Sequence, residues 1–232
     1  VLKRKNELVR PAVANIDQAL VVFAIVRPNP HFNLLDRFLV MMESKKIPVI
    51  LCFNKEDIAT DPQVKELEAI YENCGYPLIF TSALEDKNID QVKEVLRGKT
   101  TAIAGPSGVG KSSIINILHP EANMETGAIS SKIERGKHTT RHTELFPVDA
   151  DSYIMDTPGF SSLYVNDFEK EELKYYFPEF AAYEGTCKYN GCDHIHEPGC
   201  AVKEAVEEGK IHKVRYQNYI EMYEELKNKR RY

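Results

Sequence analysis

Residues 105–113 read Gly105-Pro106-Ser107-Gly108-Val109-Gly110-Lys111-Ser112-Ser113, a glycine-rich loop of the Walker A type. An apolar run at 101–104 precedes this loop, and the helical pattern Ile114-Ile115-Asn116-Ile117-Leu118 follows it. A strand, a glycine loop and a helix in this order are the context that supports such a match. The glycines let backbone N–H groups converge on phosphate at a helix N-terminus, where the helix dipole favours negative charge. We therefore predict a nucleoside-triphosphate site in which Lys111 binds the β and γ phosphates and serves catalysis, and Ser112 ligates Mg²⁺.

Two further segments fit the phosphate side of such a site. Asp156-Thr157-Pro158-Gly159 follows an apolar run and fits the DxxG motif, in which Asp156 binds magnesium through water and the Gly159 N–H senses the γ phosphate. By itself this tetrapeptide also fits an ordinary strand-ending turn, and the Walker A loop upstream favours the motif. Between the two lies Gly136-Lys137-His138-Thr139-Thr140-Arg141, where a switch I loop should supply a threonine to magnesium. Both Thr139 and Thr140 fit that role.

Two segments that fit guanine recognition lie earlier in the chain. Asn54-Lys55-Glu56-Asp57 follows an apolar run and fits the NKxD motif, although a polar turn that caps a helix has a similar composition. Asp57 can accept hydrogen bonds from N1–H and the 2-amino group of guanine, donors that adenine does not present. We expect the stem of Lys55 to cover the ring and Asn54 to tie this loop to the Walker A loop. Thr81-Ser82-Ala83 matches the companion motif, in which the Ala83 N–H meets guanine O6.

The order of these motifs is unusual, because the guanine motifs come before the phosphate motifs. Most GTPases have the order P-loop, switch I, DxxG, NKxD and SA, so we predict a circularly permuted domain. A permutation leaves the site intact in space and moves the chain ends. The DxxG segment would then lead directly into the C-terminal region, so a γ-phosphate signal could move that region.

The motifs do not identify the residue that orients or deprotonates the attacking water. Many GTPases place a glutamine after the DxxG glycine, whereas this chain has Phe160, which cannot hydrogen-bond to water. His138 in the switch I segment is the candidate that positions or deprotonates the water. It also fits a solvated loop histidine or an RNA contact. A site without the glutamine predicts slow intrinsic turnover that awaits an activating partner.

The pattern of apolar runs predicts an α/β fold with a second, smaller domain. Runs that read as buried strands lie at 19–26, 47–53, 77–81, 100–104 and 153–155, and helical spacing lies between them at 34–43, 62–71, 89–96 and 112–118. This alternation predicts a layered α/β domain with a mostly parallel sheet. From about residue 167 the chain reads as an acidic helix, a Cys/His cluster and a helix from about 212 with an apolar stripe. We place the domain boundary near Asn166, so that the second domain comprises 167–232.

The Cys/His cluster predicts a structural zinc site. Cys187, Cys192, His194 and Cys200 offer four good ligands in a loop-rich stretch. A Cys₃His set suits tetrahedral Zn²⁺, and a closed shell of four protein ligands is typical of structural sites. A redox pair is the alternative for the cysteines, and His196 is the alternative to His194 as the fourth ligand.

Composition narrows the function classes. The chain of 232 residues is 43% hydrophobic and 28% charged, as in an ordinary soluble protein, and no apolar run approaches the roughly 18 residues of a membrane span. The formal net charge of −5 repels nucleic acid as a whole, so RNA contacts require local basic clusters. One such cluster lies at 3–10 and another at 227–231, although both also fit solvated tails. We expect a monomer that binds neither DNA nor a membrane, in a reducing compartment.

The permuted motif order, the loop at 136–140, Phe160 and the spacing of the cysteines and histidine together resemble the RsgA family (YjeQ and YloQ) of small ribosomal subunit biogenesis GTPases. The resemblance implies a cytoplasmic bacterial factor that binds the 30S subunit late in its maturation, contacts 16S rRNA, hydrolyses GTP when the subunit stimulates it, and leaves. Members of the family carry an N-terminal OB-fold. Residues 1–10 would be its remnant or a linker, and 11–166 the permuted GTPase domain.

Two rival functions remain at this point. A nucleotide kinase or ATPase could use the same P-loop, although Asp57 and its two predecessors disfavour adenine. A GTP-switched RNA-binding module, in which the zinc domain grips rRNA and hydrolysis is incidental, is the non-enzymatic alternative.

Overall fold

A six-stranded sheet forms the centre of the protein. The computed structural model describes residues 15–124, 144–156 and 168–228. The strands β1 (Gln18–Ala24), β2 (Val49–Asn54), β3 (Leu78–Phe80), β4 (Thr100–Ala104), β5 (Glu144–Pro147) and β6 (Tyr153–Asp156) are arranged in the order β3-β2-β1-β4-β6-β5. Every neighbouring pair is parallel except β5 and β6. The prediction of a mostly parallel α/β sheet is confirmed, and the antiparallel edge strand β5 is an addition to it.

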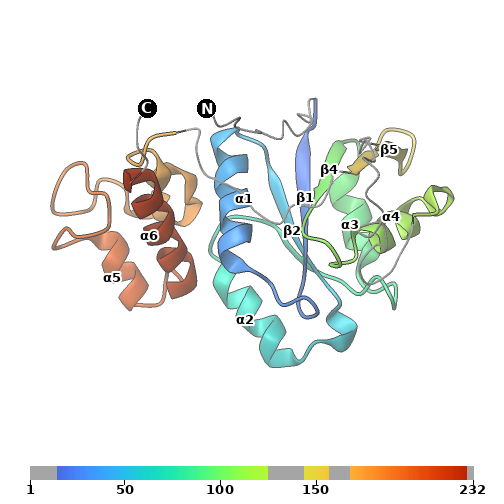
Figure 1. The fold of residues 1–232 in the computed structure, drawn as a ribbon, viewed down its shortest axis with the longest axis horizontal. Helices are drawn as coiled ribbons and strands as arrows, with labels where there is room; N and C mark the ends of the chain where they lie inside the picture. Colours follow the sequence, from blue (N-terminus) through green and yellow to red (C-terminus); the bar gives the residue numbers. More distant parts are fainter. Residues whose placement is uncertain (1–14, 125–143, 157–167, 229–232) are drawn as a thin grey trace, which may run out of the picture.

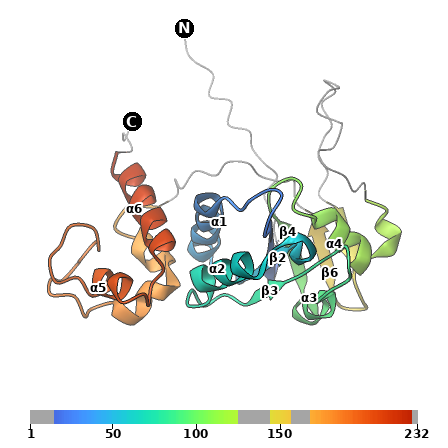
Figure 2. The ribbon, with the colours of Figure 1, turned by 90° about the horizontal axis from the view of Figure 1, so that it is seen from below.

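Helices cover both faces of this sheet because its central strands are apolar on both faces. On β1, Ala19, Val21 and Phe23 belong to one buried cluster, whereas Leu20, Val22 and Ala24 belong to the other. The first cluster includes side chains of α1 (Phe32–Ser44) and α2 (Asp61–Tyr71). The second includes side chains of α3 (Ile89–Leu96) and α4 (Lys111–Leu118). Figure 2 shows the resulting layers, with the strands between the two pairs of helices.

A third buried cluster lies mainly in the C-terminal part and includes Val40 of α1. Its other members come from the 3₁₀ segments Leu173–Tyr176 and Pro178–Tyr183, from the helices α5 (Ala201–Glu207) and α6 (Lys213–Asn228), and from the loops that connect these elements. The expected acidic helix after about residue 167 is wrong for the described residues, which form these two short 3₁₀ segments. Pro178 interrupts the pattern because it lacks an N–H and disfavours helical geometry at Phe177, which is extended with φ −115° and ψ 92°.

A buried ionic cluster joins the C-terminal part to the sheet domain where α6 lies beside α1 (Figure 1). The Arg215 guanidinium donates to both carboxylate oxygens of Glu179, at 2.7 and 3.0 Å, and to Asp36 Oδ1 on α1 at 2.6 Å. Asn218 Nδ2 and the Tyr71 hydroxyl also donate to Asp36, at 2.5 and 3.0 Å. The two carboxylates raise the pKa of Arg215 well above its ordinary value despite burial, so the guanidinium stays charged.

Within the described ranges, no helix is both long enough and apolar enough to cross a lipid bilayer.

Candidate functional site

The predicted nucleotide-binding segments meet at one edge of the sheet. The Walker A loop follows β4, Asn54 ends β2, Thr81 follows β3, and Asp156 ends β6. These strands are parallel neighbours, so their carboxyl ends lie on the same side, which is where open α/β sheets bind their ligands. The fold therefore brings together the described parts of four motifs that are up to 102 residues apart, from Asn54 to Asp156.

The side chain of Asn54 connects three of these segments. Its amide Nδ2 donates to the Val109 carbonyl in the Walker A loop at 3.0 Å, as expected from the motif. Its Oδ1 accepts from the Thr81 hydroxyl at 3.2 Å and from the Ala83 N–H at 3.0 Å. Asn54 is buried, so each of these bonds also satisfies a polar group that water does not reach. The amide therefore sets the distance between the two base-recognition segments and the phosphate loop.

Asp57 is the residue predicted to recognise the base, and a hydrogen bond orients its carboxylate. The Ser82 hydroxyl donates to Asp57 Oδ1 at 2.7 Å. This contact leaves Oδ2 and the remaining lone pairs of the carboxylate for a ligand. The Ala83 N–H, expected to meet guanine O6, donates to Asn54 in this structure, so its contact with the base stays a prediction.

Lys55 links the base segment to the phosphate loop on a second path. Its backbone is left-handed with φ 70°, and its ammonium donates to the Gly108 carbonyl at 2.6 Å and to the Arg27 carbonyl. Burial lowers the pKa of Lys55, and the nearby Asp57 carboxylate opposes that shift. The stem of Lys55 is thereby held between two loops, as a cover for a base requires. The Arg27 carbonyl was not a predicted site residue, because no motif contains it.

Two glycines of the Walker A loop leave room for neighbouring backbone and side chains. A Cβ on Gly105 would lie 2.0 Å from the Val22 carbonyl oxygen, and one on Gly110 would lie 2.1 Å from Asn54 Nδ2. Gly110 also has a φ of +101°, which disfavours other residues. The hydrogen bonds that join Asn54 to Val109, Thr81 and Ala83 are hereafter called the Asn54 junction. A glycine at position 110 is therefore required by this junction as well as by the loop.

The described phosphate side includes the half-buried Lys111 ammonium and the Asp156 carboxylate. The Lys111 ammonium donates to the carbonyls of Gly105 and Pro106, at 2.9 and 2.7 Å. Burial lowers the pKa of Lys111, and Asp156 opposes this shift. Burial raises the pKa of Asp156, and Lys111 opposes that shift in turn. A bound polyphosphate would supply the negative charge that Lys111 lacks here.

The other predicted phosphate residues fall into two groups. Ser112 and Ser113 lie in the first turn of α4, half-buried, and Ser107 and Gly108 are exposed at the tip of the loop. His138, Thr139, Thr140, Gly159 and Phe160 lie outside the described residues, so their roles remain predictions.

The predicted metal ligands lie together in the C-terminal part. One ligand atom from each of the four residues lies within 4.8 Å of the others, and the set is Cys187, Cys192, His194 and Cys200. His194 Nδ1 lies 3.3 Å from the Cys200 sulfur and 3.6 Å from that of Cys187. His196 is exposed and does not belong to this group. The soft thiolate and imidazole donors suit Zn²⁺, so the cluster could hold a zinc ion.

Burial controls the proton state of these ligands before a metal binds. Burial raises the pKa of Cys192 to about 12 and also raises that of Cys200. Burial lowers the pKa of His194, so its imidazole is neutral, as a metal ligand must be. The Cys192 thiol is therefore protonated at neutral pH, and a metal ion must displace its proton.

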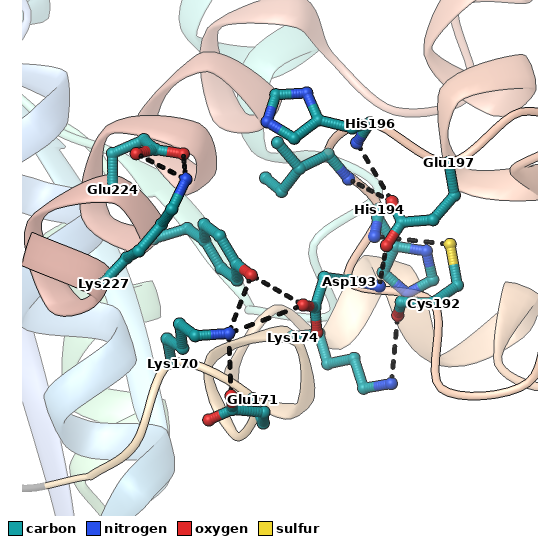
Figure 3. A network of polar contacts seen from close by, with 12 residues as sticks. Lys170, Glu171, Lys174, Cys192, Asp193, His194, His196, Glu197, Glu224 and Lys227 are labelled. Carbon is teal, nitrogen blue, oxygen red and sulfur yellow. Dashed lines mark hydrogen bonds and ion pairs between the residues drawn. The ribbon is translucent and has the colours of Figure 1, made fainter.

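The loop at 187–200, hereafter the metal loop, is held by polar contacts that the sequence did not reveal (Figure 3). The Glu197 carboxylate accepts from the backbone N–H groups of Asp193, Ile195 and His196, each at 3.0 Å. Burial raises the pKa of Glu197, but these hydrogen bonds, led by that of Asp193, lower it overall to about 2. The carboxylate therefore folds the turn around His194.

The tyrosines of α6 support the same loop with their hydroxyl groups. Tyr216 donates to the His194 carbonyl at 2.7 Å, Tyr219 to the Asp193 carbonyl at 2.6 Å, and Tyr223 to the Asp193 carboxylate at 2.6 Å. The rings of this predicted apolar stripe do pack in the C-terminal cluster. Three tyrosines at helical spacing indicate a helix face whose rings are apolar and whose hydroxyl groups can form hydrogen bonds.

Comparison with known proteins gives consistent matches over the whole chain. The model of the RsgA GTPase family matches residues 1–166. A small ribosomal subunit biogenesis GTPase RsgA from Agathobacter rectalis is 60% identical over 232 residues, which are all of this chain and 77% of that protein. The protein of the same name from Alkaliphilus metalliredigens is 47% identical over 232 residues and is covered to 80%.

Two solved structures are similar in fold. The crystal structure of YjeQ from Thermotoga maritima has a TM-score of 0.80 and 40% identity, over 99% of this chain and 78% of that one. The structure of YloQ, described as a circularly permuted GTPase, has a TM-score of 0.76 and 39% identity, over 100% of this chain and 75% of that one.

Proposed function

The chain belongs to the RsgA GTPase family and is a GTP-hydrolysing enzyme, and from this premise we propose that it acts in late maturation of the 30S ribosomal subunit. The observation that carries the proposal is the relative from Agathobacter rectalis, which is 60% identical over the whole chain and is named for small-subunit biogenesis. The Asn54 junction between base and phosphate segments supports the same activity.

Guanine specificity follows from Asp57 and its surroundings. The carboxylate accepts from N1–H and the 2-amino group of guanine, while Ser82 holds Oδ1 in place at 2.7 Å. Adenine presents neither donor and would leave a half-buried carboxylate unpaired, at a cost of about 1.5–3 kcal/mol per missing charge-assisted bond. Lys55 covers the ring from a position fixed by two carbonyl groups. The cofactor-binding set is thus Asn54, Lys55, Asp57, Ser82 and Ala83 on the base side.

The phosphates bind at the Walker A loop. Backbone N–H groups of 105–113 and the N-terminus of α4 surround the polyphosphate, and Lys111 turns from the Gly105 and Pro106 carbonyls to the β and γ phosphates. Magnesium with GTP is implied by the family. Ser112 and Asp156, which face this side, would hold it, and the ion would neutralise charge on the phosphates.

Water attack is assigned to the switch I segment. His138 positions or deprotonates the water, and Thr139 or Thr140 would complete the magnesium site. The chain places phenylalanine at 160, where a water-orienting glutamine is common in GTPases, so intrinsic hydrolysis is slow and the ribosomal subunit stimulates it.

The C-terminal domain, from about 167 onwards, provides a second contact with the particle. Zinc bound by the Cys₃His set fixes the metal loop, and this domain and the basic clusters near the chain ends contact 16S rRNA in the bacterial cytoplasm. The acidic net charge of the chain restricts RNA contacts to such local clusters.

Hydrolysis by the full-length protein tests this function. We would measure phosphate release from GTP and from ATP, with and without purified 30S subunits, at one fixed salt concentration. We expect 30S subunits to raise the turnover of GTP but not that of ATP, by up to roughly 10³-fold if the subunit supplies or orders a catalytic group. Asp57→Asn is the matched control, which should lose GTP turnover.

Two outcomes would contradict the proposal in different ways. Equal turnover of GTP and ATP would refute the role of Asp57. GTP-specific turnover that is indifferent to 30S would leave the GTPase activity intact and refute the coupling to the ribosomal subunit. Tight GTP-dependent binding to 30S without stimulated turnover would favour the alternative of an rRNA-binding switch with incidental hydrolysis.

A further inference from the structure

An ion pair joins the two predicted base-recognition segments. Glu56 occupies the position that the NKxD motif leaves open, and its Oε1 lies 2.9 Å from the Lys87 ammonium. Lys87 lies beyond Ala83 in the loop that follows β3, and no motif includes it. The Lys87 side chain is 51% exposed and the Glu56 side chain 20% exposed.

This ion pair is one of several contacts that connect the two base-recognition segments. Ser82 and Lys87 pair with each other through two backbone hydrogen bonds of 3.2 and 2.9 Å. Ser82 then binds the Asp57 carboxylate at 2.7 Å, and Lys87 binds the Glu56 carboxylate. The two bridge-paired residues of one segment, Ser82 and Lys87, therefore bind two consecutive carboxylates of the other, Asp57 and Glu56. The Glu56 N–H adds a third link, to the Thr81 carbonyl at 3.0 Å.

Lys87 is the partner that compensates the charge of Glu56. The second carboxylate oxygen, Oε2, is buried and has no hydrogen-bond partner among the described residues. Removal of Lys87 would leave a mostly buried carboxylate without its counter-charge, which is more costly than the loss of an exposed ion pair. Arg97 and Glu94 form such an exposed pair at 2.8 Å, with side chains 72% and 64% exposed.

We propose that Glu56 and Lys87 are a positioning pair that fixes the Asp57 carboxylate and the Ser82–Ala83 backbone for recognition of guanine. The inference rests on the proposed GTPase function and deepens it. It gives Glu56, which the sequence predicts as part of the nucleotide-binding segment Asn54-Lys55-Glu56-Asp57, a role through Lys87 and Asp57 instead of a direct contact with the base. Neither side chain touches the nucleotide, and both act through Asp57 and Ser82.

The affinity ratio between GDP and IDP measures this role. Hypoxanthine in IDP lacks the 2-amino group, so IDP makes one bond fewer to Asp57 and depends less on the orientation of its carboxylate. For Lys87→Met in the full-length protein we expect GDP affinity to fall about tenfold, the effect of weakening one charge-assisted bond, and IDP affinity to fall clearly less. The ratio of the two affinities should therefore decrease, as measured by titration calorimetry.

Three further variants define the result. Lys87→Arg should keep the wild-type ratio, because arginine keeps the charge, and Arg97→Met should leave both affinities unchanged. Glu56→Gln combined with Lys87→Met should be less harmful than the sum of the single effects, because both remove one interaction.

The proposal is overturned if Lys87→Met lowers thermal stability but leaves the GDP-to-IDP ratio at the wild-type value, since that is a purely structural role. Additive effects of the two substitutions would overturn it as well. A wild-type protein that does not prefer GDP to IDP and ADP would instead refute the base site itself, so the two failures are distinguishable.

Discussion

The polar groups of the nucleotide site already have protein partners, whereas the four candidate metal ligands of the metal loop face one another. Asn54 makes three hydrogen bonds to three residues, and Lys111 and Lys55 each bind two carbonyls. In the metal loop, three sulfurs and one imidazole are gathered within 4.8 Å, with His194 Nε2 buried and without a partner among the described residues.

The difference indicates which site depends on its ligand for structure. Parallel strands and their core support the nucleotide segments, so the site forms without nucleotide. The metal loop follows short 3₁₀ segments and precedes a helix of 7 residues, so the metal itself must supply much of its stability. Removal of the ligand should then unfold one region and leave the other intact.

The largest expected effect follows from loss of a metal ligand. Cys192→Ser should abolish stoichiometric zinc and unfold the C-terminal part, because zinc binding contributes about 10–16 kcal/mol to the folding of small zinc domains. Zinc content by plasma spectrometry and calorimetric unfolding would measure both effects. Cys74→Ala is the control, since this buried cysteine lies in the sheet domain and should leave zinc binding unchanged. A Cys192→Ser protein with a normal C-terminal transition would contradict the comparison.

The next effect concerns the ionic cluster that joins the two regions. Arg215→Met leaves Asp36 and Glu179 buried without their cation, so the free energy of unfolding should fall by about 3–5 kcal/mol. The unfolding transitions of the two regions should also move further apart, as observed by calorimetry. Arg37→Met removes an ion pair to Glu225 across the same interface, with side chains 14% and 38% exposed, and should cost less than about 1 kcal/mol. Equal effects of the two variants would show that burial of the cluster is unimportant.

Gly110→Ala tests whether nucleotide binding depends on the hydrogen bond between Asn54 and the Walker A loop. The added Cβ would lie 2.1 Å from Asn54 Nδ2 and must break its bond to Val109, so GDP affinity should fall roughly 100-fold. Gly98→Ala shares the positive φ, at +68°, but its Cβ meets nothing within 4 Å. It should lower stability and leave affinity unchanged, as equilibrium titration with GDP would determine. Zinc content should be normal in both variants, and a loss of zinc in Gly110→Ala would show that the two sites depend on each other.

The smallest effect is expected at Glu197. Glu197→Gln replaces a charged acceptor of three backbone bonds by a neutral one, which should destabilise the metal loop by about 1–2 kcal/mol and speed zinc release to a chelator. The pKa of Glu197 is lowered to about 2 in the folded state, from 4.5. Its contribution is thus complete above about pH 4.5 and is lost as the pH falls towards 2. Glu207→Gln on the exposed face of α5 is the control and should release zinc at the wild-type rate.

The sequence was most informative where a chemical requirement fixes both residue type and spacing. The bond from Asn54 to the Walker A loop and the gathering of Cys187 with Cys200 could be predicted, because each motif implies its own geometry. The strands followed from apolar runs, since a parallel sheet buried on both faces needs such runs. The edge strand β5 was missed because its four residues include a glutamate and a proline, which are unusual in a strand.

Residues whose partners are distant in the sequence could not be found in this way. Arg215 stands on a helix whose charge pattern is otherwise that of an exposed surface, and its burial is decided by Asp36 and Glu179. Lys87 and Glu197 belong to no motif, because their partners are respectively a single carboxylate and backbone groups. Such positions depend on tertiary structure that spacing does not encode.

The separation between Asp36 and Arg215 also has a consequence for the synthesis of the chain. These residues are 179 positions apart, and Glu179 is itself made long after α1 has left the ribosome. Until both emerge, the growing chain exposes an aspartate on a helix face that has no cation to cover it. The sheet domain therefore reaches its final surface only after Arg215 has been synthesised, so termination before that residue would release a domain that is folded at its nucleotide site but unfinished at α1.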